Sequence, residues 1–349
     1  EMVDLERAYA GRRVLVTGHT GFKGGWLCHL LHALGADVYG LALAPEAESL
    51  FERAHVARCC DHSLGDIRDL HAVRRTVERA RPEIVFHLAA QALVLRSYAD
   101  PVETFASNVM GTAHVLEALR PHETCRAVVV VTSDKVYDNV ERQAAYHEGD
   151  RLGGSDPYSA SKACAELVAQ SYARSFFKTQ VGIATARAGN VIGGGDFAEN
   201  RLLPDIVRAA RRGERVVLRN PRATRPWQHV LDPLAGYLTL GARLLEEPHS
   251  FAKPYNFGPD DDGYSVEEVA RRFAALVGID GVETRPDSGA AHEAKLLRVD
   301  AGRAHRELGV RCRYDLGRSL ELTADWYRAY LRGEDVAALT RAQVQAFLG

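Results

Sequence analysis

The 349-residue chain has almost no net charge and no long apolar run. Its 44 lysines and arginines stand against 46 aspartates and glutamates, a formal net charge of −2. This balance gives no general attraction to nucleic acid or to an anionic membrane surface. No segment approaches the roughly 20 consecutive apolar residues that a membrane-spanning helix needs. We therefore expect neither nucleic acid nor a membrane among the partners.

Paired cysteines and signal-like segments are also lacking. The six cysteines form no CxxC pair, and the first residues, EMVDLERAYAGRR, contain no apolar signal core. The neighbouring Cys59 and Cys60 have no metal-ligand residues at suitable spacing, so we interpret them as ordinary thiols and expect no metal. These features predict a reduced, cytoplasmic protein.

Lysine is scarce, with six residues in the chain, and three of them lie in the motifs described below: Lys23, Lys135 and Lys162. Arginine is the usual cation elsewhere. A site that requires a compact or titratable amine cannot use arginine, so these three lysines are candidates for chemistry.

Short β-branched runs alternate with longer helical patterns over the first half of the chain. Each run is nearly all apolar in its middle, which is typical of a strand buried on both faces. The predicted strands are 12–17, 37–43, 84–88, 127–132 and 181–187, and the predicted helices are 24–34, 70–80, 101–119 and 159–176. This order predicts an α/β fold with a doubly wound parallel sheet of the Rossmann type.

The pattern changes near residue 193 to loops rich in Gly, Pro and Arg between shorter elements. We expect helices at 203–211, 234–245, 265–277 and 316–331 and strands at 216–218 and 255–257. We therefore predict a dinucleotide-binding domain over 1–190 and a smaller C-terminal substrate-binding domain over 191–349, with some crossing of the chain between them.

A glycine-rich turn follows the first predicted strand. It consists of Gly18, His19, Thr20, Gly21, Phe22, Lys23 and Gly24. Glycines let the backbone turn sharply and approach a pyrophosphate at a helix N-terminus. Between a strand and a helix, this turn predicts a dinucleotide site. Lys23 would meet the pyrophosphate, meet a 2′-phosphate or lie in solvent.

The adenosine end of the predicted cofactor site is less specific. The second strand ends without the acidic residue that would hold an adenosine ribose, so the sequence defines the class of cofactor better than its identity. NAD is the expected cofactor, and NADP is not excluded. In the segment GDIRD at 65–69, Asp66 and Ile67 would lie beside an adenine. The alternative is a capped helix start, which Asp66 or Asp69 could equally provide.

Tyr158 and Lys162 are four residues apart at the start of a helix, so they share one face. Lys162 and an oxidised nicotinamide would lower the pKa of the Tyr158 phenol from about 10 toward neutrality. The phenolate could then remove a proton from a sugar hydroxyl. Ser133, just after a predicted strand, would hold the same hydroxyl by a hydrogen bond.

With these motifs in place, the chain resembles the extended short-chain dehydrogenases/reductases, and within them the CDP-glucose 4,6-dehydratases. The similarity runs nearly from end to end. It is carried by VTGHTGFKGGWL at 16–27, GDIRD at 65–69, PEIVFHLAAQ at 82–91, DPVETFASNVMGT at 100–112, LGGSDPYSASKACAELV at 152–168, ARAGNVIGGGD at 186–196 and RPWQHVLDPLAGY at 225–237.

The resemblance implies a mechanism in three stages: hydride removal from C4 of the glucose with Tyr158 as base, loss of water across C5 and C6, and hydride return to C6. It makes Asp134 the acid for the departing hydroxyl, provided that burial keeps it protonated. Lys135 would be the base at C5 if it is held neutral, or would stabilise the enolate.

The resemblance also implies further ligand contacts and an oligomer. Cofactor contacts are expected from Leu88, Ala89, Ala90 and Asn108, and nucleotide-sugar contacts from Gln91, Asn190, Arg201, Arg219, Arg225, Gln228 and His229. A CDP-hexose is the favoured substrate. The helices at 101–119 and 159–176 are expected to form the interface of a homodimer or homotetramer.

Two other functions are open at this stage. A 4-epimerase, or a dehydratase acting on another nucleotide-hexose, would use the same fold. A non-catalytic dinucleotide sensor would need none of Ser133, Tyr158 and Lys162, which together argue against it.

Overall fold

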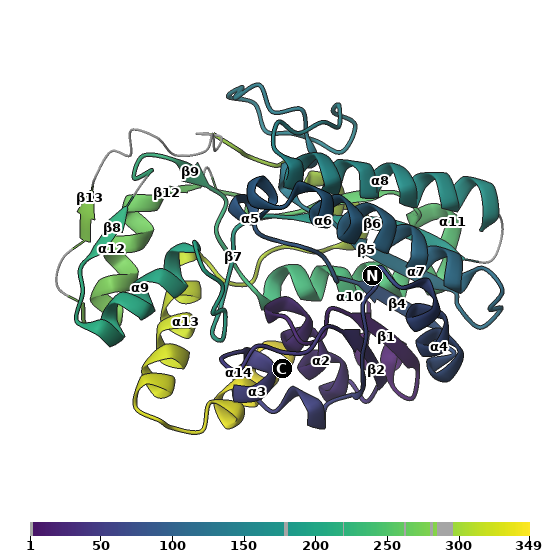
Figure 1. Cartoon of the computed structure of the whole chain (residues 1–349), viewed down its shortest axis with the longest axis horizontal. Helices are drawn as coiled ribbons and strands as arrows, with labels where there is room; N and C mark the ends of the chain where they lie inside the picture. The colour runs from purple at the N-terminus through teal and green to yellow at the C-terminus, as the bar shows by residue number, and fades with distance from the viewer. Residues whose placement is uncertain (1–2, 178–180, 219, 262, 280–281, 285–295) are drawn as a thin grey trace.

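The structure is a computed structural model, which describes residues 3–177, 181–218, 220–261, 263–279, 282–284 and 296–349. Its centre is a seven-stranded sheet in the order β11-β6-β5-β4-β1-β2-β3 (Figure 1). The strands are β1 (Arg13–Thr17), β2 (Asp37–Ala42), β3 (Asp61–Leu64), β4 (Ile84–His87), β5 (Ala127–Val131), β6 (Gly182–Ala188) and β11 (Pro254–Phe257). Each pairing is parallel. The predicted fold class and five strands of the first half are confirmed.

The sheet separates two hydrophobic cores. In β5, Val129 and Val131 contribute to one core, and Val128 and Val130 contribute to the other. Because side chains alternate along a strand and both faces are covered, apolar side chains are favoured on both faces of the inner strands. This explains the unbroken apolar runs in the sequence.

Helices cover both faces of the sheet, so the domain has three layers (Figure 1). One face carries α4 (Leu70–Ala80), α6 (Pro101–Phe105), α7 (Gly111–Leu119) and α8 (Pro157–Phe176), with α5 (Val94–Ala99) beside α6 and α8. The π-helical segment η2 (Ala106–Met110) joins α6 to α7, so the predicted helix 101–119 is one continuous helical segment.

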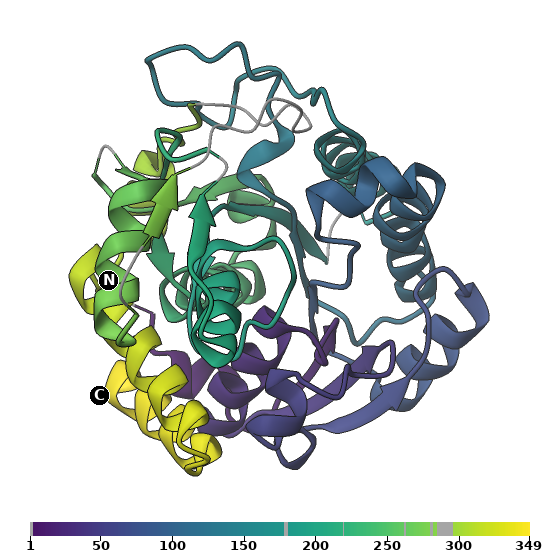
Figure 2. The same ribbon diagram turned by 60° about the vertical axis from the view of Figure 1, so that its left-hand side comes forward.

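The opposite face is covered by helices from both ends of the chain and by two helices from its second half, α10 (Leu231–Glu246) and α11 (Pro248–Phe251). The helices from the ends are α1 (Leu5–Tyr9), α2 (Phe22–Ala33) and α14 (Val336–Leu348). Figure 2 shows the C-terminal helices, in yellow, next to the N-terminal elements, in purple. Here α14 packs against α2, and α13 (Leu316–Leu331) packs against α14. The sequence did not predict α14.

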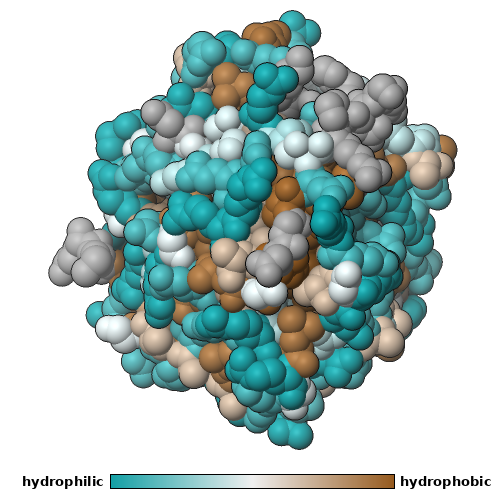
Figure 3. All heavy atoms as spheres, turned by 90° about the vertical axis from the view of Figure 1, so that its left-hand side faces the viewer, coloured by the Kyte–Doolittle hydropathy of each residue, from teal (hydrophilic) through white to brown (hydrophobic). Residues whose placement is uncertain are grey.

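The smaller region begins after β6 and contains short elements. They are β7 (Val191–Ile192), α9 (Leu202–Arg212), β8 (Val216–Leu218), β9 (Thr224–Arg225), β10 (Gln228–His229), β12 (Tyr264–Ser265), α12 (Val266–Leu276), β13 (Val282–Thr284) and η4 (Ala304–Leu308). Hydrophilic and hydrophobic side chains are intermixed on the side of the molecule shown in Figure 3, and hydrophobic ones gather toward its middle. Two short helices, α3 (Leu50–Arg53) and η1 (Val56–Arg58), precede β3.

The strand predicted at 255–257 lies in the main sheet, because β11 pairs with β6. We had placed it in the substrate-binding part. Parallel pairing joins strands that are far apart in sequence, so no local pattern indicates this partner. The domain division at residue 190 stays a prediction. Among the described residues, no helix combines the length and apolar character required to cross a bilayer.

A buried ion pair joins α8 to the sheet. The Glu166 carboxylate on α8 accepts hydrogen bonds from Arg187 Nε at 2.9 Å and from Arg187 Nη2 at 2.8 Å. The hydroxyls of Thr132 and Thr185 donate to the same carboxylate at 2.5 and 2.6 Å. Both charged side chains are almost completely inaccessible to water. Each charge therefore depends on the other for compensation.

We predict that Glu166→Gln destabilises the protein by about 3–5 kcal/mol, because it leaves the Arg187 charge buried without a counter-charge. Urea denaturation would measure this change. The matched control is Glu267→Gln, which breaks the exposed pair with Arg271 and should cost less than about 1 kcal/mol. Equal losses in the two variants would contradict this account of the buried pair.

Candidate active site

The turn after β1 passes so close to the loop after β4 that it requires glycine. Gly18 has φ +80°, and a Cβ atom there would lie 2.7 Å from the backbone N of Ala89. A Cβ on Gly24 would lie 2.1 Å from the Gly18 carbonyl oxygen. Neither contact can be relieved by moving a side chain. Close approach of backbone segments therefore requires glycine at both positions, and the predicted approach to a pyrophosphate stays a prediction.

Helix α2 starts directly from this turn. Gly21 is its N-cap residue and offers no side-chain acceptor, so the first amides of α2 can serve an external anion. The Thr20 hydroxyl donates to the Leu43 carbonyl at 3.0 Å, which ties the turn to the end of β2. Strand order reverses between β1 and β4, the usual binding position in such sheets. These features fit a dinucleotide.

At the adenosine end, Asp69 rather than Asp66 caps the following helix. Asp69 Oδ1 accepts from His71 N at 2.9 Å and is the N-cap of α4. Asp66 is paired with Arg68, and this hydrogen-bonded pair lowers the pKa of the Asp66 carboxyl. Ile67 is buried. The structure thus assigns the cap to Asp69 and leaves contact of Asp66 and Ile67 with an adenine as a prediction.

His87 is a buried structural residue below the cofactor turn. Its Nδ1 lies 2.7 Å from Thr17 Oγ1, and its Nε2 lies 3.0 Å from Thr112 Oγ1. Thr112 donates its own proton to Asn108 O, so we assign the His87 proton to Nε2. Burial lowers the pKa of His87 to about 3, and the Lys162 ammonium contributes in the same direction. The ring is neutral.

Ser133 and Asp134 lie where β5 ends. The Ser133 hydroxyl donates to Asp134 Oδ1 at 3.0 Å and accepts from Lys135 N at 3.2 Å, capping the short helix η3 (Asp134–Val136). Asp134 is buried, and its Oδ2 has no hydrogen-bond partner among the described residues. A Cβ on Gly189 would lie 1.8 Å from this oxygen, so the carboxyl fits only beside glycine. Lys135 is half-buried.

Tyr158 and Lys162 lie on the same buried face of α8, as predicted. Burial raises the pKa of Tyr158, although a hydrogen bond with Ser133 and the charge of Arg201 act in the lowering direction. The expected lowering of this pKa included the charge of an oxidised nicotinamide, so it stays a prediction for the complex with cofactor. Burial also lowers the pKa of Lys162 to about 7, with Lys23 contributing.

Lys23 points inward, not into solvent. Its Nζ lies 5.8 Å from the centre of the Tyr237 ring. Burial lowers the pKa of Lys23 to about 8; Arg201 adds to this effect and Asp134 opposes it. Of the three positions considered for Lys23, the solvent position is therefore wrong. The side chain belongs to the group around Tyr158 and Asp134.

Gln91 and Asn108 bind each other behind this group. Gln91 N donates to Asn108 Oδ1 at 2.8 Å, and Asn108 Nδ2 donates to Gln91 O and to Ser161 Oγ. The Gln91 side-chain amide donates to Leu93 O and Thr104 Oγ1. Both residues therefore hold α8 against the loop after β4. Their ligand contacts stay predictions, as do those of Leu88, Ala89 and Ala90 in the same loop.

Asn190 and Arg201 approach the site from the chain after β6. Asn190 has φ +46°, and its carbonyl accepts from Gln228 N at 3.3 Å. Arg201 pairs with Asp196 at 2.8 Å, and the charge of Asp196 is the main cause that raises the pKa of Arg201. Arg201 also lies within electrostatic range of Tyr158. Both positions are suitable for contact with a sugar diphosphate.

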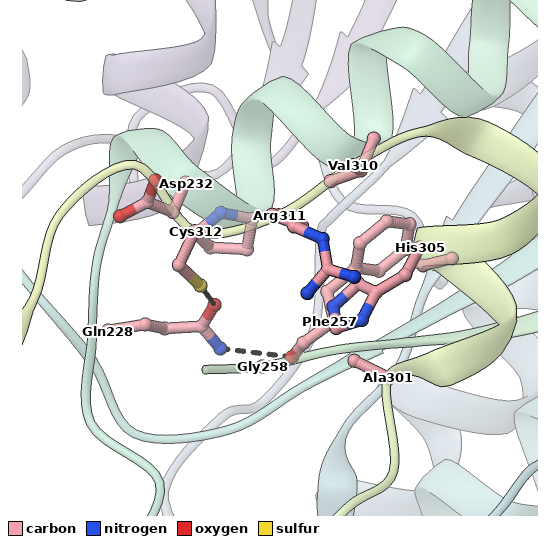
Figure 4. Close-up of a pocket in the computed structure, with 11 residues that line it drawn as sticks. Gln228, Asp232, Phe257, Gly258, Ala301, His305, Val310, Arg311 and Cys312 are labelled. Carbon is pink, nitrogen blue, oxygen red and sulfur yellow. Dashed lines mark hydrogen bonds between the residues drawn. The ribbon is translucent and has the colours of Figure 1, made fainter. Parts of the chain in front are cut away.

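The remaining predicted substrate residues are more deeply buried. Gln228 Nε2 donates to Gly189 O at 3.2 Å and to Phe257 O at 3.0 Å, and its Oε1 faces Cys312 (Figure 4). His229 is completely buried, and burial lowers its pKa to about 3. Arg225 is also buried, and its Nη1 donates to Thr224 O. Through these hydrogen bonds, Gln228 stabilises the segment that contains Gly189 against β11.

One predicted site residue, the possibility of a metal site, and the site residues that the sequence did not predict have yet to be described. Arg219, predicted to bind substrate, lies outside the described residues. In the described ranges, no three His, Cys, Asp or Glu side chains group to hold a metal. Sequence reasoning missed Glu166 and Tyr237. The only signal for Glu166 was its position one helical turn after Lys162, and none indicated that Tyr237 faces the site.

Solved structures with bound NAD share this architecture. A UDP-glucose 4-epimerase from Stenotrophomonas maltophila, solved with NAD, matches with a TM-score of 0.80 and 25% identity over 92% of this chain and 99% of its own. DesIV, a dTDP-glucose 4,6-dehydratase from Streptomyces venezuelae solved with NAD, matches with a TM-score of 0.79 and 25% identity over 93% and 99%.

We predict that Gly18→Ala weakens NAD binding at least tenfold, since a Cβ atom would push the turn away from Ala89. Calorimetric titration with NAD would measure the affinity. Gly213→Ala is the matched control, because Gly213 also has positive φ, +64°, but has open space around the added atom. Loss of affinity in both variants would indicate a general folding defect instead.

Sequence comparison gives the same relationship. A CDP-glucose 4,6-dehydratase from Salmonella typhimurium is 44% identical over 99% of both chains. A dTDP-glucose 4,6-dehydratase from Xanthomonas campestris is 28% identical over 90% of this chain. The profile of the NAD dependent epimerase/dehydratase family matches residues 14–258. The chain is therefore a member of the NAD dependent epimerase/dehydratase family.

Proposed function

We propose that this chain is a nucleotide-sugar 4,6-dehydratase that converts CDP-glucose to CDP-4-keto-6-deoxyglucose with NAD. The main support is the end-to-end similarity to the Salmonella enzyme of that name. The arrangement of Ser133, Asp134, Tyr158 and Lys162 beside the glycine turn provides the groups that this reaction needs. We further propose that it acts in the cytoplasm, where its six unpaired cysteines would stay reduced.

The residues around the turn fit the dinucleotide. Gly18 and Gly24 let the turn pack closely against Ala89 and against the start of α2, whose first amides are available for the charge of a pyrophosphate. When bound, NAD supplies a hydride acceptor at C4 and a hydride donor at C6, so no external oxidant is needed. The family and the NAD-bound neighbours support NAD over NADP.

Tyr158 is the proposed base for the C4 hydroxyl. Its phenol interacts with the Ser133 hydroxyl, so both groups can contact the same sugar oxygen. Lys162 Nζ donates to Val131 O at 3.2 Å, which fixes the amine below the tyrosine. Because burial raises the pKa of Tyr158, proton removal depends on the positive charges that surround the phenol in the complete site.

Asp134 is the proposed acid for the C6 hydroxyl. It is buried, and Oδ2 is free of protein partners among the described residues, so this oxygen can carry and transfer a proton. Lys135 is adjacent and half-buried. Two roles are compatible with its position: removal of the C5 proton, or electrostatic stabilisation of the enolate.

A 4-epimerase is the alternative reaction on this fold, and another nucleotide-hexose is the alternative substrate. An epimerase needs to rotate its keto sugar but does not need an acid for a leaving hydroxyl. The buried carboxyl of Asp134 therefore favours dehydration. A non-catalytic sensor would have no use for the Ser133, Tyr158 and Lys162 group.

The test is incubation with NAD and CDP-glucose deuterated at C4, followed by mass spectrometry. We expect a product lighter by one water with the deuterium now at C6, because the hydride is removed and returned within one active site. An unchanged sugar mass would indicate an epimerase. Absence of reaction, with NAD bound, would direct the search to UDP-, GDP- and dTDP-sugars.

We also propose that the chain forms at least a dimer through α5, α6, η2 and α8. Seven of the twelve large hydrophobic side chains that are exposed among the described residues lie on these elements: Leu95, Tyr98, Val102, Phe105, Met110, Leu167 and Phe176. An apolar surface of this kind is unusual on a monomer. Two copies would bury it in a symmetric contact.

We expect sedimentation at micromolar concentration to give a dimer or larger species. The double variant Val102→Asp with Leu167→Asp should dissociate it, because both side chains are more than half exposed on this surface. Val217→Asp is the control, since Val217 on β8 is exposed elsewhere. A monomeric wild-type protein would contradict the proposal.

A further inference from the structure

The loop between β7 and α9 runs along the glycine-rich turn and carries a buried carboxylate. The Gly194 carbonyl accepts a hydrogen bond from Trp26 Nε1, on α2, at 2.9 Å. A Cβ atom on Gly193 would lie 3.2 Å from Cζ of Phe22, which belongs to the turn itself. Asp196 follows in this loop and is buried. The loop therefore brings a carboxylate close to the proposed active site.

Three hydrogen bonds hold the backbone of this loop. The hydroxyl of Tyr327, on α13, donates to the Asp196 carbonyl. The guanidinium of Arg208, on α9, donates to the carbonyls of Phe197 and Ala198 at 2.9 and 3.0 Å. Two helices of the C-terminal half thus fix the position of Asp196, and neither of them carries a residue of the group around Tyr158 and Asp134.

Asp196 in turn holds Arg201 by one nitrogen. Asp196 Oδ1 accepts from Ala198 N at 3.1 Å, and Asp196 Oδ2 accepts from Arg201 Nη1 at 2.8 Å. The Asp196 side chain is 7% exposed, whereas the Arg201 side chain is 36% exposed. Within the described residues, Arg201 Nε and Nη2 make no hydrogen bond. Since a guanidinium can donate from each of its nitrogens, these two are available to a ligand.

The place of Arg201 suits a phosphate of the substrate. Arg201 lies within electrostatic range of Tyr158, the proposed base at C4 of the sugar. A nucleotide sugar carries its diphosphate on C1, across the same ring, and the β-phosphate is the one joined to the sugar. A long cationic side chain near Tyr158 can therefore reach the β-phosphate, and a guanidinium matches phosphate oxygens by paired hydrogen bonds.

We infer that Asp196 is a positioning residue, which orients Arg201 toward the β-phosphate of a nucleoside diphosphate sugar. The inference rests on the proposed function. An unrestrained arginine side chain samples many rotamers and loses this freedom when it binds a ligand. Asp196 restricts Arg201 before the ligand arrives, and the buried carboxylate depends on the charge of Arg201 in return. The pair weakens the net charge offered to a phosphate but defines the direction of the guanidinium.

Asp196→Asn separates orientation from charge. It keeps an oxygen for Ala198 N and removes the carboxylate that holds Arg201. Calorimetric titration of the NAD-saturated protein with CDP and with CMP would measure the two affinities. We expect CDP to bind about tenfold more weakly and CMP to bind as before, because CMP has no β-phosphate.

The sign of the change decides between two roles of Asp196. If Asp196 only neutralised Arg201, its replacement would leave more positive charge in the site, and CDP would bind more tightly. Tighter or unchanged binding of CDP would therefore overturn the inference. Equal weakening of CDP and CMP would also overturn it, since that result would indicate general damage to the site.

Turnover of CDP-glucose gives a second readout. Asp196→Asn should raise KM about tenfold with kcat nearly unchanged, because the diphosphate is bound alike in the ground state and the transition state. A comparable fall in kcat would contradict the positioning role. The matched control is Glu48→Gln, which breaks the pair of Glu48 with Arg211, 2.7 Å apart, at the other end of α9. We expect this control to keep the KM of the wild-type protein.

Variants of Arg201 keep the inference testable if Asp196→Asn does not fold. A lysine retains the charge but cannot hold Asp196 and a phosphate through one rigid fork, so Arg201→Lys should weaken CDP binding nearly as much as Arg201→Met. In an Arg201→Met background, Asp196→Asn should weaken CDP binding no further. CDP affinity of the wild-type level in Arg201→Lys, or additive losses in the double variant, would overturn the inference.

Failure of the wild-type protein to dehydrate CDP-glucose would overturn the proposed function instead. The same titrations with UDP and UMP, and with dTDP and dTMP, would then decide the positioning role, because the β-phosphate is common to all nucleoside diphosphates. A wild-type protein that prefers none of the three diphosphates to its monophosphate would overturn the inference as well.

Discussion

The positive charge of Arg187 lies inside the molecule, and the active site is arranged around the carboxylate that neutralises it. Glu166 binds Arg187 on β6 and the hydroxyl of Thr132 at the end of β5. Ser133 follows Thr132, and Lys162 is one helical turn before Glu166. Arg187 also donates to Tyr137, beyond η3. One carboxylate therefore fixes α8, two strands and the segment that carries Asp134, so stability and catalytic geometry depend on the same contact.

Close backbone approach is the second constraint on the site. The first turn fits against Ala89 because Gly18 has no side chain, and Asp134 fits because Gly189 has none. Each contact joins segments from different strands at the same edge of the sheet. The glycine turn and the proposed acid, Asp134, are thus positioned by segments that only glycine allows to approach so closely. Substitution of either glycine would therefore displace residues of the proposed active site without changing any polar side chain.

The sequence predicted those parts of the structure that depend on local pattern. Helices α4 and α13 begin and end where the periodicity indicated, and the apolar strands reflect burial on both faces. Strand β3 was not predicted, because its residues, Asp61 to Leu64, are mostly polar and lie at a sheet edge. The direction of the Tyr158 pKa and the inward position of Lys23 depend on burial by distant segments, which spacing along the chain does not reveal.

Strand β11 has a consequence for the order in which the protein can be completed during synthesis. Because β11 is the outer neighbour of β6, the hydrogen-bonding edge of β6 stays open while the ribosome makes the elements from β7 to α11. An uncovered strand that is wholly buried in the finished protein can pair with other nascent chains. The nascent chain is therefore exposed to aggregation in this interval, after Tyr158 and Lys162 have been made, and chaperone protection would matter most then.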